Sequence, residues 1–393
     1  MKTDGPKIEE ILSRNVQEVI SKPHLEKRLK KGEKLRVKFG IDPTSADLHL
    51  GHSLCLRKLK NFQDLGHQII FLIGDFTAQI GDPSDRANTR KPLTSAEIEK
   101  NMKDYISQAD RILDIKKVEI RHNSEWYNKK NLGFLINLTS RFTHARLVER
   151  DDFQKRIKAN IDISMSELLY PLLQGYDSVE LRADLEIGGS DQKFNLLMGR
   201  KVQKKYNLPE QDIITLPLLI GTDGEVKMSK SYGNYIGLKE SAAEMFGKIM
   251  SIPDKLIWDY FKLLTDLSLS EIERIKKETK NPRDAKNRLA LEITAFYYGV
   301  NASRAAESEF QRVFKEKKAP AKIEEVKIKE RALAVMDLLV GTGQAASKSE
   351  AKRLILQGGV KINDKLQPNW QEIVQIKKGM IIQTGKRKFI KIN

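Results

Sequence analysis

The chain has 393 residues, 40% of them hydrophobic, and a formal net charge of +17. This length predicts two or three domains, and no apolar run approaches the roughly 18 residues that a membrane span needs. The single cysteine, Cys55, excludes an internal disulfide framework and a cysteine metal cluster, so we expect a cytoplasmic protein without a metal cage.

The positive charge is concentrated near the C-terminus. Between Arg331 and Asn393, twelve lysine or arginine residues stand against four aspartate or glutamate residues, a net charge of +8. An enzyme that acts only on small anions does not need such a field, whereas a large polyanion binds to it. The composition favours a nucleic-acid partner, and the alternative is a solvated basic face.

Strands and helices alternate in the first part of the chain. Residues 35–41 alternate apolar and polar side chains as a strand does, a helix follows and ends near Gly66, and residues 69–73 form a buried strand. The same strand–helix–strand pattern returns at 183–187, 192–206 and 213–220. These patterns predict an α/β fold with a Rossmann-like, doubly wound parallel sheet and a helix-rich insertion at about 124–181.

The remainder of the chain is helical and then mixed. Residues 240–314 have helical periodicity, and the charged segment 316–330, which contains Pro320, is typical of a linker. The tail has helical and then strand patterns at 333–339, 348–357, 381–384 and 388–392. We expect a catalytic domain at 1–238, an all-helical domain at 239–325 and a small α+β domain at 326–393.

The segment Asp42-Pro43-Thr44-Ser45-Ala46-Asp47-Leu48-His49-Leu50-Gly51-His52 lies where the first strand gives way to a helix. Gly51 lets the main chain approach a ligand, the helix start carries positive partial charge, and two histidines three residues apart can face one cavity. The segment therefore predicts a phosphate site. The alternative is that the histidines only cap the helix or lie exposed.

A second segment, Lys227-Met228-Ser229-Lys230-Ser231, lies among Gly221, Gly224 and Gly233. Single lysines in loops are usually solvated. Two of them in a glycine-rich loop can instead close over a polyphosphate and stabilise the charge of departing pyrophosphate.

A third segment places three polar side chains on one helix face. Tyr170, Gln174 and Asp177 stand at positions i, i+4 and i+7. By themselves they could form a satisfied core network or line a binding site.

The segments that contain His49 to His52 and Lys227 to Ser231, in this order on a Rossmann pattern, resemble the paired motifs of class I aminoacyl-tRNA synthetases. The segments Tyr170–Asp177 and Gly188–Gln192 resemble those of tyrosyl-tRNA synthetases, and the resemblance extends from Leu35 to the C-terminus. It implies a ligase that makes tyrosyl-adenylate from tyrosine and ATP and transfers the tyrosyl group to tRNA(Tyr). Mg²⁺ would enter with ATP without a dedicated protein site, and family members are homodimers joined through the insertion.

The resemblance also assigns residue roles. Catalytic stabilisation of charge is expected from Thr44, His49, His52, Lys227 and Lys230. ATP is expected to contact Asp42, Gly51, Gly189, Asp191, Arg86, Arg90, Met228, Ser229 and Ser231. Tyrosine is expected to contact Lys38, Gly40, Asp82, Tyr170, Gln174, Asp177 and Gln192. The resemblance implies that the helical domain at 239–325 binds tRNA on the anticodon side. The tail resembles an RNA-binding domain shared with a ribosomal small-subunit protein, and there tRNA is expected to contact Lys348, Lys352, Arg353 and Lys361.

One position departs from the family pattern. Many members have a tyrosine that binds the substrate phenol where this chain has Lys38. Strand alternation turns Lys38 away from the face of Val37 and Phe39, so it reaches the pocket, pairs with Asp177, or has no part in substrate binding.

Three other functions are compatible with parts of the pattern. A tryptophanyl-tRNA synthetase shares the catalytic fold, but the face of Tyr170, Gln174 and Asp177 argues against it. An RNA-binding protein that has lost catalysis would not need both histidines and both lysines. A small-molecule nucleotidyltransferase would leave the basic tail unexplained.

Overall fold

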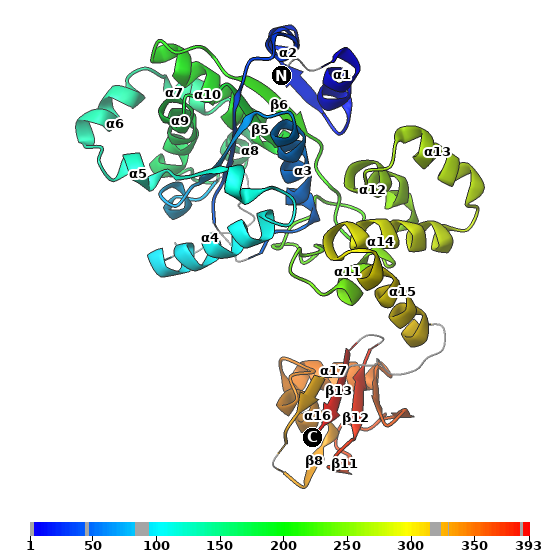
Figure 1. The fold of residues 1–393 in the computed structure, drawn as a ribbon. Helices are drawn as coiled ribbons and strands as arrows, with labels where there is room; N and C mark the ends of the chain where they lie inside the picture. The colour runs from blue at the N-terminus through cyan, green and yellow to red at the C-terminus, as the bar shows by residue number, and fades with distance from the viewer. Residues whose placement is uncertain (1–3, 44–46, 83–93, 315–323, 329, 386–387) are drawn as a thin grey trace. The chain divides into compact units, whose positions relative to one another are not determined.

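The computed structural model describes residues 4–43, 47–82, 94–314, 324–328, 330–385 and 388–393. By their contacts they form two compact units, Met1–Ser303 (unit 1) and Arg304–Asn393 (unit 2). Figure 1 shows the layered sheet and helices of unit 1 and the smaller mixed structure of unit 2. Within the described ranges, no helix is long and apolar enough to cross a membrane.

Unit 1 is built on a six-stranded sheet. Its strands are β1 (Glu18–Ile20), β2 (Arg36–Ile41), β3 (Gln68–Ile73), β4 (Glu119–His122), β5 (Leu185–Gly189) and β6 (Asp212–Leu216), in the order β1-β6-β5-β2-β3-β4. All neighbours are parallel except β1, which runs antiparallel to β6. The predicted α/β fold is confirmed, although β6 ends before the predicted 220 because Pro217 has no N–H to donate.

Two crossover helices set the layers of unit 1. Helix α3 (Leu50–Asp64) connects β2 to β3, and α10 (Lys193–Lys205) connects β5 to β6. The two connections move in opposite directions along the sheet, so right-handed crossovers place these helices on opposite faces. Before β4, the described residues also form the α-helices α1 (Gly5–Ser13), α2 (Lys22–Lys31) and α4 (Ser95–Ala109).

The predicted insertion is helical. It contains α5 (Ser124–Tyr127), α6 (Leu132–Thr139), α7 (His144–Leu147), α8 (Asp151–Lys158) and α9 (Met165–Glu180). A core that includes Trp126, Phe153, Leu172, Tyr176 and Met198 holds these helices against α10. Burial of these large apolar side chains stabilises α9, the helix that carries the predicted amino-acid face.

Five α-helices follow the sheet within the described residues 217–314. They are α11 (Ala242–Ile249), α12 (Ile257–Leu264), α13 (Leu269–Glu278), α14 (Pro282–Tyr298) and α15 (Val300–Phe314). Helix α14 begins with Pro282 at its first turn, where a missing N–H costs nothing, and its Asn281 side chain accepts from the N–H of Arg283. The helical periodicity of this region is confirmed.

Unit 2 has one small core. Its elements are β7 (Glu324–Val326), β8 (Ala332–Ala334), α16 (Val335–Gly341), α17 (Lys348–Leu356), β9 (Val360–Ile362), β10 (Lys365–Leu366), β11 (Ile373–Gln375), β12 (Ile381–Thr384) and β13 (Lys388–Ile392). The main sheet has the order β10-β9-β12-β13-β7. Residues 324–326, assigned to a linker by their charge, instead form a strand parallel to β13, because pairing with a sheet edge stabilises even a charged short strand.

Candidate functional site

A cavity of about 340 Å³ lies at the carboxyl ends of the central strands of unit 1. Its walls include Gly40 from β2 and Gly189 from β5, two neighbouring parallel strands. The chain leaves β2 toward β3 and leaves β5 toward β6, in opposite directions along the sheet. The cavity therefore occupies the point at which doubly wound sheets bind ligands.

Most residues predicted from the sequence line this cavity. They are Lys38, Gly40, Asp42, His49, Gly51, His52, Asp82, Tyr170, Gln174, Asp177, Gly189, Asp191, Gln192, Lys227, Met228, Ser229, Lys230 and Ser231. Thr44, Arg86 and Arg90 lie outside the described residues. The four predicted tRNA-binding residues belong to unit 2.

His49 and His52 cap the N-terminus of α3. The N–H of Gly51 donates to Nδ1 of His49 at 3.2 Å, and the N–H of His49 donates to Nδ1 of His52 at 3.2 Å. Gly51 permits this approach, since a Cβ there would stand 3.0 Å from the His49 ring. The capping considered as an alternative is thus present, and the same rings line the cavity.

Capping also fixes the protonation of the two imidazoles. An Nδ1 that accepts a hydrogen bond leaves the proton on Nε2, so each ring can donate one bond to an anion. Burial and the charges of Lys230 and Lys227 lower the pKa of His52 to about 4, and burial and His52 lower the pKa of His49 well below its ordinary value. Both imidazoles are therefore neutral donors near pH 7.

The two lysines of the second segment contact carboxylates in the walls of the site. Lys227 Nζ lies 2.7 Å from Asp191 Oδ2, and Lys230 Nζ lies 3.3 Å from Asp47 Oδ2. Lys239 Nζ lies 3.7 Å from the other oxygen of Asp47. Burial lowers the pKa of Lys230, and Asp47 opposes that shift. The ammonium groups are held close to the cavity rather than in open solvent.

Asn234 organises this lysine loop, and sequence analysis missed it. Its side chain is buried, accepts from the N–H of Ser229 at 2.8 Å, and donates to the carbonyl of Lys227 at 3.1 Å and to Asp223 Oδ2 at 2.7 Å. A Cβ on Gly221 would stand 2.1 Å from Asn234 Nδ2, so only glycine fits there. An amide bonded to the backbone on both sides of the loop has no signal in a single sequence beyond the neighbouring glycines.

Tyr170, Gln174 and Asp177 all come from α9. The hydroxyl of Tyr170 donates to Asp42 Oδ2 at 2.9 Å, and the hydroxyl of Thr77 donates to Asp42 Oδ1 at 2.8 Å. Burial raises the pKa of Asp42 to about 8. Tyr170 is thus bonded within the protein, whereas Oε1 of Gln174 is buried without a hydrogen-bond partner in the part of the chain that the structure describes. All three side chains of this face line the cavity.

Asp177 is almost fully buried. Trp126 Nε1 donates to its Oδ1 at 3.0 Å, and Asn123 Nδ2 donates to its Oδ2 at 3.4 Å. Burial raises the pKa of Asp177 to about 7, and the charge of Lys38 opposes this rise. Asn123 and Trp126 were not predicted, because nothing in their local sequence indicates that they face α9.

The Lys38 ammonium pairs with Glu186, not with Asp177 as one of our alternatives had it. Its Nζ lies 2.8 Å from Glu186 Oε1, and both side chains are buried. Glu186 lies in β5, parallel to β2, at the position that pairs with Lys38. A glutamate inside the apolar strand Leu185–Ile187 was the available signal, since a buried charge needs a partner.

Asp82 is held by residues from two other elements. Arg150, only 4% exposed and just before α8, donates to Asp82 Oδ1 at 2.9 Å. Gln192 Nε2 donates to Asp82 Oδ2 at 2.7 Å, and Asn195 accepts from Arg150 at 3.2 Å. Asp82 and Gln192 were predicted from the sequence, whereas Arg150 and Asn195 were not, because their partners lie far along the chain.

The predicted tRNA-binding residues are exposed on consecutive elements of unit 2. Lys348, Lys352 and Arg353 lie on α17, and Lys361 lies on β9. Lys352 Nζ stands 4.4 Å from the centre of the Trp370 ring. Exposed cations on neighbouring elements suit contact with a nucleic-acid backbone.

Two family models together span most of the chain. Residues 30–315 match "tRNA synthetases class I (W and Y)", and residues 315–392 match "Tyrosine–tRNA ligase SYY-like C-terminal domain". Among individual proteins, the chain is 49% identical to the tyrosine–tRNA ligase of Thermotoga maritima, over 98% of this chain and 96% of that one. It is 45% identical to that of Aquifex aeolicus, over 97% of each chain.

Solved structures agree on the fold. The C-terminally truncated mitochondrial tyrosyl-tRNA synthetase of Aspergillus nidulans matches with a TM-score of 0.65 at 23% identity, covering 78% of this chain and 94% of that one. The Archaeoglobus fulgidus tyrosyl-tRNA synthetase matches with a TM-score of 0.62 at 24% identity, covering 77% and 99%. Because the curated relatives are similar over nearly the full length of both chains, this chain belongs to the tyrosine–tRNA ligases, a family of class I aminoacyl-tRNA synthetases.

Proposed function

We propose that the cavity of unit 1 joins tyrosine to ATP and then transfers the tyrosyl group to tRNA(Tyr). The carboxylate of tyrosine attacks the α-phosphate, tyrosyl-adenylate forms, and pyrophosphate leaves. The terminal adenosine of the tRNA then takes up the tyrosyl group, and AMP leaves. The observation that carries this proposal is that one cavity is lined by neutral imidazoles, ammonium groups and buried carboxylates.

The imidazoles and the ammonium groups would bind the phosphates of ATP. His49 and His52 can each donate an Nε2–H, and Lys227 and Lys230 can add positive charge where the leaving pyrophosphate becomes more negative. Neutral imidazoles do this without repelling the lysines. We assign Thr44, Arg86 and Arg90 to the same phosphate end by family resemblance alone.

The carboxylates would bind the amino acid. Asp82, with Tyr170, Gln174 and Gln192, suits the substrate ammonium, because all four line the cavity. Asp177 is the acceptor proposed for the phenol hydroxyl. A buried acceptor that phenylalanine or tryptophan leaves without its donor rejects both, because an unsatisfied buried polar group is costly.

We propose further ATP contacts with other residues that line the cavity. Asp191 and Gly189, at the end of β5, would hold the ribose, and Gly51 would let the main chain approach the nucleotide. We propose that Mg²⁺ accompanies ATP, since a nucleoside triphosphate binds it through its own phosphate oxygens. No group of three or more histidine, cysteine, aspartate or glutamate residues in the described ranges could hold a metal ion.

Unit 2 would bind the tRNA. Its exposed Lys348, Lys352, Arg353 and Lys361 supply positive charge, and its mixed sheet and core fold around different residues from those of unit 1. We propose three functional regions, catalytic at 1–238, helical at 239–325 and RNA-binding at 326–393.

The free, buried Cys55 is in keeping with a reducing cytoplasm.

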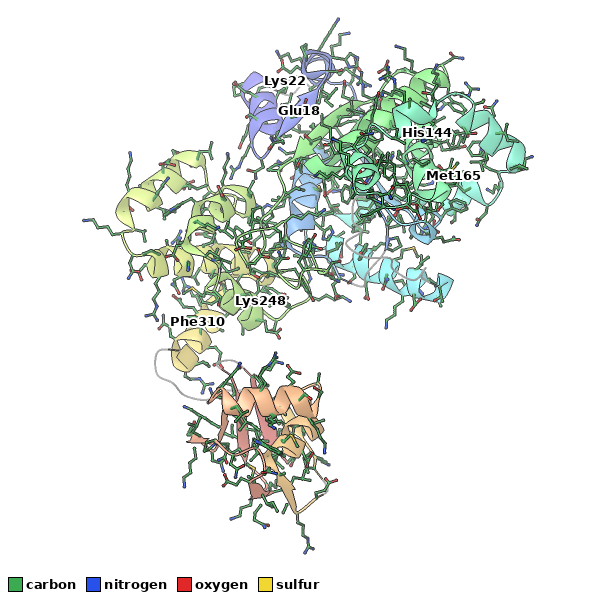
Figure 2. All side chains as sticks on the ribbon, turned by 180° about the vertical axis from the view of Figure 1, so that it is seen from behind. Glu18, Lys22, His144, Met165, Lys248 and Phe310 are labelled. Carbon is green, nitrogen blue, oxygen red and sulfur yellow. The ribbon has the colours of Figure 1, made fainter. Side chains whose placement is uncertain are left out.

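The insertion would form a homodimer. Large apolar side chains are exposed on it, from 49% for Ile157 to 73% for Met165, with Leu132, Ile136 and Ile161 between these values. Figure 2 marks this segment by His144 and Met165. Several such side chains on one segment are typical of a protein–protein interface, and a second copy of the chain is the partner we propose.

Amino-acid-dependent exchange of pyrophosphate into ATP tests the activation step. Tyrosine should support strong exchange, and tryptophan almost none. Lys230→Ala should slow the exchange markedly, whereas Lys204→Ala, a control whose side chain is 75% exposed on α10, should not. If none of the amino acids supports exchange, the proposed enzyme activity is wrong, and an RNA-binding protein without catalysis is the better explanation.

A further inference from the structure

A closed polar cluster lies under α9, built around a buried ion pair. Lys38 Nζ contacts Glu186 Oε1 at 2.8 Å, Ser178 Oγ at 2.9 Å and the carbonyl oxygen of Gln174 at 3.1 Å. The side chains of Lys38 and Glu186 are 0% and 2% exposed. Each of the three N–H bonds of the ammonium therefore has an acceptor within the protein.

The carboxylate of Glu186 is satisfied in the same way. Its Oε2 accepts from Gln211 Nε2 and, at 3.3 Å, from the hydroxyl of Ser178. Gly199 makes room for this cluster, because a Cβ there would stand 2.6 Å from Gln211 Nε2 and 3.2 Å from Glu186 Oε2. A pair with this many bonds in a buried site has one fixed geometry.

The ammonium is thus a fixed charge and not a donor to the substrate. It contacts α9 at Gln174 and Ser178, on either side of Asp177 in the sequence. Its charge acts on the Asp177 carboxyl, whose pKa burial raises and Lys38 lowers. Asp42 from the end of β2 and Tyr127 from α5 also interact with Asp177.

We propose that the Lys38–Glu186 pair is a specificity-determining device, in which a fixed ammonium, bonded to α9 at Gln174 and Ser178, positions Asp177 as the acceptor for the substrate phenol. This rests on the proposed function. An anion that loses its donor when phenylalanine binds is costlier to bury than a neutral acid, so the pair sharpens discrimination without touching the ligand. Lys38 is then a positioning residue, acting through Asp177.

The decisive measurement is the pH profile of kcat/KM for tyrosine in pyrophosphate exchange, from which the midpoint pH is taken. The second readout is the ratio of kcat/KM for tyrosine to kcat/KM for phenylalanine at pH 7. Lys38→Met should move the midpoint up by about one pH unit and reduce the ratio roughly tenfold, since one pKa unit is a tenfold change. Glu186→Gln, which keeps the ammonium and removes its counter-charge, should move the midpoint down or leave it. The KM for ATP should stay the same in both variants.

The double variant Lys38→Met/Glu186→Gln guards against a folding artefact, because it leaves no lone buried charge. It should retain the raised midpoint and the reduced ratio. If it recovers the wild-type profile, or if both single variants shift the midpoint in the same direction, the pair is structural only and the inference fails. Wild-type protein without tyrosine-dependent exchange would instead sink the proposed function itself, so the two failures are distinguishable.

Discussion

Asn234→Ala should disable the lysine loop while leaving tyrosine binding intact. Two of its bonds hold the loop backbone on either side of Met228, at the carbonyl of Lys227 and the N–H of Ser229. At about 1 kcal/mol each, their loss weakens the ordered loop by roughly 2 kcal/mol, which corresponds to about a 30-fold lower kcat for exchange. The KM for tyrosine should stay constant, because the tyrosine-binding side chains proposed on α9 are not held by Asn234.

Two further variants sharpen this test. Gly221→Ala should reproduce the defect, because its Cβ would stand 2.1 Å from Asn234 Nδ2 and displace the amide. Asp223→Ala removes the bond from Asn234 Nδ2 to Asp223 Oδ2 and the bond from the N–H of Glu225 to Asp223 Oδ1. It leaves the bonds of Asn234 to Lys227 and Ser229 in place and should cost much less. Steady-state exchange kinetics and thermal melts measure both effects. The reasoning is refuted if Asn234→Ala leaves kcat within about threefold of wild type, or if it raises the KM for tyrosine as much as it lowers kcat.

Three more outcomes follow from the site. Asp177→Asn should lower kcat/KM for tyrosine by roughly 10- to 100-fold, from 1.5–3 kcal/mol for a bond to a charged group, while Tyr176→Phe on the same helix should leave the tyrosine-to-phenylalanine ratio unchanged. Tyrosine affinity in equilibrium dialysis should increase from pH 6 to pH 8, because Asp177 and Asp42 ionise with pKa values of about 7 and about 8. Their raised pKa values should make ligand-free stability fall over about pH 4 to 8, since the folded state then binds more protons than the unfolded state, and a flat profile in both measurements would contradict this. Deleting residues 324–393 should preserve pyrophosphate exchange and abolish tRNA charging, and loss of both would mean that the deleted segment stabilises unit 1.

The sheet and its crossover helices could be predicted because their cause is local. Apolar runs such as 69–73 and the helical spacing around Leu59 determine buried strands and amphipathic helices without knowledge of distant contacts. The edge strand β1, Glu18–Ile20, escaped prediction because three residues carry too little periodicity, and its pairing with β6 is a tertiary event. The same holds for β7 in unit 2.

The residues of the site likewise differ in whether their own segment of sequence indicates their role. His49, Lys230 and Tyr170 could be found because glycines and helical spacing in their own segments indicate their chemistry. Arg150 could not, because its role comes from a carboxylate partner far along the chain, brought near only by packing. The sequence around Glu186 indicates that this residue needs a partner but not that the partner is Lys38. The groups that contact ligands thus have local signals, and the groups that orient them do not.

Charging of tRNA(Tyr) by the full chain tests the central claim most directly. With ATP, a tRNA(Tyr) transcript and each standard amino acid in turn, tyrosine alone should become esterified to the terminal adenosine, and the product should be lost when ATP is omitted. Equal charging with tryptophan or phenylalanine would contradict the role given to Asp177. No charging with any amino acid, in protein that binds the transcript, would contradict the account as a whole.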